Sequence, residues 1–80
     1  MKEVYLIEID GKVSQEGYAN LEDARRYMKE RAKIMNTCET IEPKFNRENT
    51  KVEYFYRSRV CPGDIKEGYI KITPVGVKGL

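Results

Sequence analysis

The chain has 80 residues and a formal net charge of +2, and 40% of its residues are hydrophobic while 35% are charged. A chain of this length and composition forms one domain with a small core, which excludes wholesale disorder and a second domain. The small net charge neither requires nor excludes an anionic partner, so only the local arrangement of charges can indicate one.

The sequence carries no sign of export or membrane insertion. Acidic side chains at Glu3, Glu8 and Asp10 interrupt the apolar run that a signal peptide would need. No apolar stretch is long enough to cross a membrane. The two cysteines, Cys38 and Cys61, are too few for a disulfide framework. We therefore expect a cytoplasmic protein with reduced thiols and no membrane partner.

Residues 2–10 are predicted to form a central strand, because apolar residues of both parities follow one another from Val4 to Ile7. Alternation puts Tyr5, Ile7 and Ile9 on one face of this strand and Val4 and Leu6 on the other. Asp10-Gly11 is a strong signal for a hairpin turn. The short, polar stretch over residues 12–19 then predicts a returning edge strand.

An amphipathic helix is predicted between Asn20 and Asn36. Its apolar residues recur at three- and four-residue steps: Leu21, Ala24, Met28, Ala32 and Met35, with Tyr27 and Ile34 widening the stripe. Asn20 is the predicted N-cap, since its side chain can accept a hydrogen bond from a first-turn amide. Acidic residues follow it, where the positive end of the helix dipole favours them.

The second half of the chain begins with an irregular loop over residues 37–50, which Ile41 and Phe45 are expected to attach to the body. A strand is predicted from Lys51 to Cys61, where alternation is strict. Its two faces carry Val52, Tyr54, Tyr56 and Val60 on one side and Lys51, Glu53, Phe55, Arg57 and Arg59 on the other. A last strand over residues 69–73 is expected to end at Pro74. This defines a single domain over residues 1–74 and a flexible tail over residues 75–80.

The predicted order β-β-α-β-β favours an α+β fold in which one helix packs on one face of a four-stranded antiparallel or mixed sheet. In a β-grasp-like arrangement the first and last strands would pair in parallel at the centre. A purely antiparallel meander fits the sequence equally well.

The residues offer little for catalysis. Histidine, the commonest general base and metal ligand, is absent from the chain. Two cysteines alone cannot build a zinc site, and no glycine-rich phosphate-binding motif occurs. We therefore expect a protein that is not an enzyme and that has no cofactor and no metal.

The sheet face away from the helix is the candidate partner-binding surface. If the predicted parities hold, this face carries Val4, Leu6, Phe55, Arg57, Arg59, Tyr69 and Lys71. Aromatic and aliphatic residues ringed by arginine and lysine are typical of a protein interface. The same mixture suits a nucleic-acid or nucleotide binder, which is the alternative function. The alternative is that this face has no binding function. In that case the Ile41–Phe45 loop or the tail covers Val4 and Leu6, and only isolated apolar residues remain exposed.

A second candidate is the basic stripe of the helix, a weak anion-binding site formed by Arg25, Lys29 and Lys33 at four-residue spacing. Acidic residues accompany the stripe: Glu22 lies four residues before Arg26, and Glu30 lies three before Lys33. A solvated helix face with paired charges explains this pattern as well.

Residues 4–28, VYLIEIDGKVSQEGYANLEDARRYM, resemble the opening of short bacteriophage and mobile-element proteins. Those proteins have a strand, a DG turn, a polar strand and a helix that begins with a leucine-acid-acid-alanine run, here Leu21 to Ala24. The resemblance implies a small accessory protein that binds and inhibits a host protein. The expected function is thus a non-enzymatic protein-binding module, whose partner is another protein or a second copy of the chain.

Overall fold

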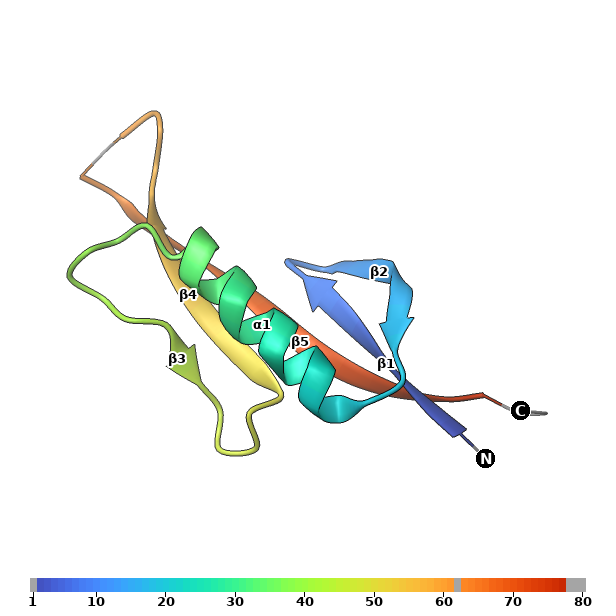
Figure 1. Ribbon diagram of the computed structural model, residues 1–80. Coiled ribbons are helices and arrows are strands. Elements are labelled where there is room, and N and C mark those ends of the chain that lie inside the picture. The colour runs from blue at the N-terminus through green and yellow to red at the C-terminus, as the bar shows by residue number, and fades with distance from the viewer. Residues whose placement is uncertain (1, 62, 78–80) are drawn as a thin grey trace.

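The part of the chain that the structure describes folds into two layers, an antiparallel sheet of five strands and one helix on one of its faces (Figure 1). The computed structural model describes residues 2–61 and 63–77. The elements are β1 (Lys2–Ile9), β2 (Lys12–Tyr18), α1 (Leu21–Met35), β3 (Lys44–Phe45), β4 (Lys51–Arg57) and β5 (Ile65–Val77). The strand order across the sheet is β2-β1-β5-β4-β3.

This architecture confirms the predicted α+β class, with β1 inside the sheet and β2 at its edge. The strand count differs, because the predicted loop contains the short strand β3. The parallel pairing of a β-grasp is wrong: β1 and β5 are neighbours, but they run antiparallel from Lys2↔Val77 to Ile9↔Ile70. The sheet is not a sequential meander either, because α1 connects the β2 edge to β3 at the opposite edge.

The hairpin between β1 and β2 forms at the predicted turn. Asp10 and Gly11 both have positive φ angles, 49° and 87°, as the two central residues of a type I′ turn require. Further along β2, a Cβ on Gly17 would lie only 2.1 Å from Val4 Cγ1. Glycine at this position therefore lets the Val4 side chain pack against the backbone of the edge strand.

Helix α1 begins and ends at the predicted residues. The Asn20 side chain accepts a hydrogen bond from the Glu22 amide at 2.8 Å, which confirms it as the N-cap. The predicted stripe faces the sheet, with Ala24, Met28 and Ala32 fully buried and Leu21, Tyr27 and Met35 packed around them. Ile34 does not belong to this stripe, because 68% of its surface is exposed.

The segment after α1 is attached to the edge of β4 by the C-cap residue, Asn36. Its Nδ2 donates to the carbonyl oxygens of Cys38 at 3.3 Å and Ile41 at 2.9 Å, while its Oδ1 accepts from the Phe55 amide at 2.8 Å. The Cys38 amide also donates to the Phe55 carbonyl oxygen at 3.1 Å. The Asn36 side chain and the Cys38 amide thus together replace the strand partner that β4 lacks at Phe55.

The turn between β3 and β4 is organised by Asn46. Its Oδ1 accepts from the amides of Thr50 at 2.8 Å and Lys51 at 3.0 Å, and its Nδ2 donates to the Thr50 hydroxyl at 2.9 Å. Asn49 adopts a positive φ of 56°, which asparagine tolerates better than most residues. The predicted irregular loop is therefore largely fixed by hydrogen bonds.

The ends of the last two strands differ from the prediction. β4 ends at Arg57, so Arg59 and Val60 lie in the following loop, and Val60 is 89% exposed instead of facing the helix. β5 continues through Pro74 to Val77, so the expected tail is strand at residues 75–77, while residues 78–80 lie outside the described part. The hairpin of β4 and β5 extends beyond the end of α1 (Figure 1).

Pro74 is tolerated inside β5 because of where its nitrogen points. Two residues earlier, the Ile72 amide donates to the Thr50 carbonyl oxygen at 2.7 Å, on the β4 side. The nitrogen of Pro74 points the same way, but β4 pairs with β5 only as far as Lys51↔Lys71. Proline therefore removes no ladder hydrogen bond at this position.

The core lies between α1 and the sheet, and Ile7, Met28, Val52 and Ile70 are its most buried large side chains. Tyr54 belongs to this core, yet its hydroxyl reaches across β5 and donates a hydrogen bond to the Asp10 carboxylate. Gly68 makes this crossing feasible, because a Cβ there would lie 2.4 Å from the Tyr54 hydroxyl oxygen. Burial, and then the Asp10 hydrogen bond, raises the pKa of Tyr54 well above its usual range.

Candidate interaction surfaces

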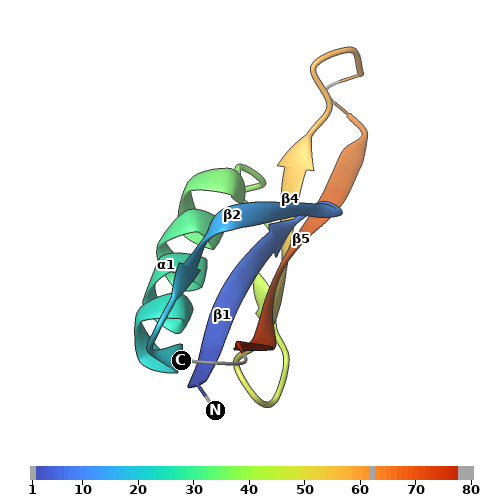
Figure 2. The same cartoon turned by 90° about the vertical axis from the view of Figure 1, so that its right-hand side faces the viewer.

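No described helix covers the sheet face opposite α1, which we call the open face (Figure 2). At one end, Val4 lies directly opposite Val75, and Leu6 lies opposite Thr73. Val4 and Leu6 are half-buried, and Val75 is 39% exposed. These three aliphatic residues form an apolar corner. The Ile41–Phe45 segment does not cover this corner, because it lies beyond β4, at the opposite edge of the sheet from β2.

Tyr69 is the aromatic centre of the open face. Its hydroxyl donates to the Glu8 carboxylate, and Lys51 Nζ lies 5.3 Å from its ring centroid. The hydrogen bond to Glu8, and then burial, raises the pKa of Tyr69. A hollow of about 420 Å³ lies beside this ring, lined by Asp10, Gly11, Lys51, Glu53, Glu67, Gly68 and Tyr69. Acidic side chains therefore outnumber basic ones around it.

Lys71 lies next to this hollow and is exposed, as predicted. It stands opposite Glu8 on β1 and opposite Lys51 on β4. Like charges placed directly opposite each other across two strands destabilise a sheet slightly. The flanking Glu8 offsets this repulsion in part, so the middle of the open face carries both signs of charge.

Phe55 lies on the predicted strand but is only 8% exposed. Lys44 Nζ lies 5.6 Å from its ring centroid, in a cation–π arrangement. The segment that leads from α1 into β3 runs along β4 at this point. The expectation that Phe55 is an exposed anchor for a partner is therefore wrong. Sequence patterning missed this because the irregular loop was expected to attach to the body through Ile41 and Phe45, with no indication that it would run along β4 over Phe55.

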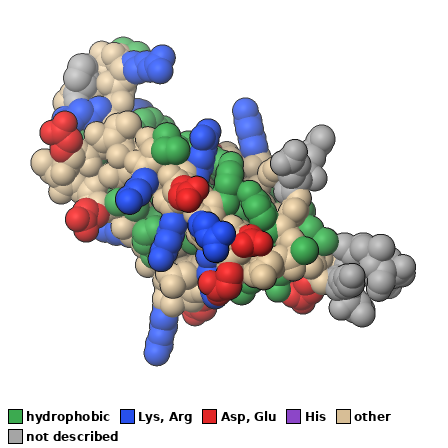
Figure 3. All heavy atoms as spheres, viewed as in Figure 1, with side chains coloured by type: hydrophobic (Ala, Val, Ile, Leu, Met, Phe, Trp, Pro, Cys, Tyr) green, Lys and Arg blue, Asp and Glu red, His purple; other side chains and the backbone are tan. Residues whose placement is uncertain are grey.

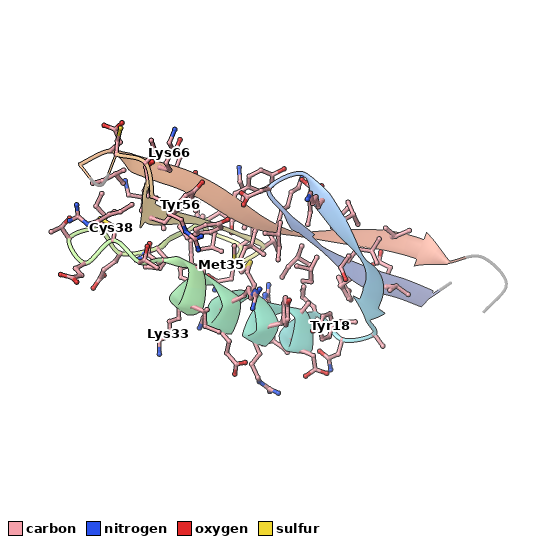
Figure 4. All side chains as sticks on the ribbon, turned by 90° about the horizontal axis from the view of Figure 1, so that it is seen from above. Tyr18, Lys33, Met35, Cys38, Tyr56 and Lys66 are labelled. Atoms are coloured by element: carbon pink, nitrogen blue, oxygen red, sulfur yellow. The ribbon has the colours of Figure 1, made fainter. Side chains whose placement is uncertain are left out.

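Arg57 and Arg59 are placed apart from Tyr69. Both line a groove of about 410 Å³ whose other lining residues are Met35, Thr37, Tyr54 and Tyr56. We call this the arginine–tyrosine groove. It lies where α1 ends, and Figure 4 shows Met35 and Tyr56 at this end of the molecule, between the helix and the β4–β5 hairpin. The seven predicted partner-binding residues are thus divided among the open face, the groove and, for Phe55, a covered site.

The basic stripe of α1 is mixed with acidic residues, and Figure 3 shows both signs of charge side by side on this face. Arg25 forms an ion pair with Glu22 at 2.5 Å and donates to the Glu48 carbonyl oxygen at 2.9 Å, so it fastens the β3–β4 turn to the helix. Lys29 lines one groove of about 300 Å³ together with Arg25 and Arg26, and a second groove of about 530 Å³ together with Lys33, Glu30, Glu42, Pro43 and Phe45. The structure therefore does not gather Arg25, Lys29 and Lys33 into one anion site.

The two cysteines are free thiols in different surroundings. Cys61 is exposed, whereas Cys38 is buried with its Sγ 3.4 Å from the Thr40 hydroxyl oxygen. The Thr40 hydroxyl lowers the pKa of the Cys38 thiol, because it can donate a hydrogen bond to the thiolate. Within residues 2–61 and 63–77, no three histidine, cysteine or acidic side chains gather as a metal-ligand set.

Protein-family models, curated proteins and solved structures give no match to this chain. Among the residues that the structure describes, no helix has both the length and the apolar character that crossing a membrane requires.

Proposed function

We propose that this chain is a small, non-enzymatic protein-binding module that docks another protein, or a second copy of itself, through the open face. The observation that carries the proposal is that α1 covers one face of the sheet, while the open face presents the apolar corner and Tyr69. Aliphatic and tyrosine side chains with a polar surround are typical of the buried centre of an interface.

The charges of the open face favour a protein over a nucleic acid as its partner. The hollow beside Tyr69 is lined by three acidic residues, Asp10, Glu53 and Glu67, and by one basic residue, Lys51. Its excess of negative charge would repel a phosphate backbone. A lysine or arginine of a partner protein would complement this hollow. Three residues that a nucleic-acid-binding open face would need are also not available on it. Phe55 is buried, and Arg57 and Arg59 line a different groove.

The resemblance of residues 4–28 to phage and mobile-element proteins suggests a biological setting for such a module. We extend the proposal to a cytoplasmic accessory protein that binds and inhibits a host protein. Cytoplasmic location agrees with the two free thiols.

The proposal is tested by placing a charge in the apolar corner. Val75→Glu should weaken self-association, measured by sedimentation over a concentration series, or capture of a host protein, by about tenfold or more. The matched control is Ile34→Glu, which adds the same charge at a residue that is 68% exposed on α1. Equal binding by wild type and Val75→Glu, with both proteins folded by circular dichroism, would contradict the proposal.

A further inference from the structure

The arginine–tyrosine groove has a composition that the open face lacks. Two of its six lining residues are arginines, two are tyrosines, and none is acidic. Its volume of about 410 Å³ lies within the range of small-molecule sites, which is roughly 300–1,000 Å³. A ligand that fills it would meet positive charge and an aromatic ring together.

The aromatic part of the groove is Tyr56, which is half-buried and therefore keeps part of its surface accessible. Its ring centroid lies 5.9 Å from that of Tyr54, with an angle of 33° between the ring planes, and this contact holds it in place from the core side. Met35, at the last turn of α1, adds a polarisable apolar surface beside it. A flat ring can stack on such a platform.

The charged part of the groove is supplied by Arg57 at the end of β4 and Arg59 two residues later. The planar guanidinium group matches the oxygen atoms of a phosphate in a bidentate manner. Lys33 in the last turn of α1 offsets the negative end of the helix dipole.

We propose that the arginine–tyrosine groove binds a free nucleoside phosphate, with the base stacked on Tyr56 and the phosphates held by Arg57 and Arg59. Thr37, the remaining polar lining residue, offers a hydroxyl to the ribose or the base. Tyr54 and Tyr56 pack at the core and place the aromatic part of the groove on the helix side of the sheet, and the groove lies at the far end of the sheet from the apolar corner, so it is independent of the protein-binding function proposed for the open face.

The test is a titration of the isotope-labelled chain with ADP, followed by NMR. Adenosine and pyrophosphate serve as partial ligands that carry only the base and sugar or only the phosphates. We expect ADP to shift the signals of Met35, Tyr56 and Arg59 with millimolar or tighter affinity, and each partial ligand to bind about tenfold or more weakly. Equal binding of pyrophosphate and ADP would overturn the proposal, because it would leave only a general anion site.

Arg59→Glu is the decisive variant, because Arg59 is exposed in a loop and its replacement leaves the core intact. It should reduce ADP affinity about tenfold or more, whereas Arg47→Glu, an equally exposed arginine in the β3–β4 turn, should not. Tyr56→Phe should keep binding and Tyr56→Leu should lose it. ADP binding that survives Arg59→Glu, no shift at about 10 mM ADP, or tighter groove binding of a short oligonucleotide than of ADP would each overturn the proposal.

Discussion

Met28 lies at the centre of the contact between α1 and the sheet, and none of its surface is exposed. Ala24 and Ala32, one turn on either side, are equally buried and bring the helix close to the sheet. Met28→Ala would leave a cavity there and should destabilise the fold by about 2–4 kcal/mol. Urea denaturation measures this loss, and Met35→Ala, at a half-buried residue of the same face, should cost clearly less.

The burial of Tyr54 and its hydrogen bond to Asp10 should make the stability of the fold decline at alkaline pH. The folded state raises the pKa of Tyr54 above the ordinary value of 10.0, because burial and then the Asp10 carboxylate oppose ionisation. This stabilisation is complete below pH 10 and is lost as pH rises towards the folded-state pKa. Tyr54→Phe should therefore reduce stability at pH 7 by about 1–3 kcal/mol and flatten its decline above pH 10.

Urea denaturation at pH 7 and above pH 10 measures both effects. Tyr69→Phe is the useful comparison, since the pKa of Tyr69 is also raised but its phenol lies on the open face. A decline above pH 10 that is as steep in Tyr54→Phe as in wild type would show that other groups cause it.

At the scale of elements, Asn36 connects α1, the following segment and β4 through three side-chain hydrogen bonds. Asn36→Ala would leave the Phe55 amide and two carbonyl groups without these partners, and should destabilise the fold by about 2–4 kcal/mol. Hydrogen exchange at the Phe55 amide should become faster. The comparison is Asn20→Ala at the other end of α1, where the loss of one cap bond should cost about 1 kcal/mol. Equal costs would mean that Asn36 acts only as a helix cap.

Elements with a strong local signal were predictable from the sequence. The helix has a 3.6-residue period and an asparagine N-cap, and the β1–β2 turn has Asp10-Gly11, so short-range physics determines both. The path of residues 36–50 was not predictable. It depends on Asn36 and Asn46, whose side chains bond to backbone groups that lie distant in the sequence or across a turn, and asparagine signals only a turn or a cap.

Across the whole molecule, the sequence predicted which side chains share a face of each strand. It did not predict which of these side chains are exposed together on one surface. Alternation placed Tyr54 and Phe55 on opposite faces of β4, which the core confirms for Tyr54. Alternation cannot show that the segment between α1 and β3 covers Phe55, or that β4 ends before Arg59. For this reason one predicted binding surface became two surfaces of different charge and composition.

The apolar corner and the arginine–tyrosine groove lie at opposite ends of β5, so their functions should be separable. The apolar corner includes Val75 at the far end of β5, whereas the arginine–tyrosine groove lies where β4 and α1 end. Val75→Glu should therefore weaken protein association without changing ADP affinity, and Arg59→Glu should do the reverse. Effects at separate, non-contacting sites are independent, so the double variant should lose each function by the same amount as the single variant that affects it. Titration calorimetry for ADP and sedimentation for association measure both in the same four proteins. If either substitution impaired both functions alike, the two surfaces would form one coupled site, and the separation argued from their positions would be wrong.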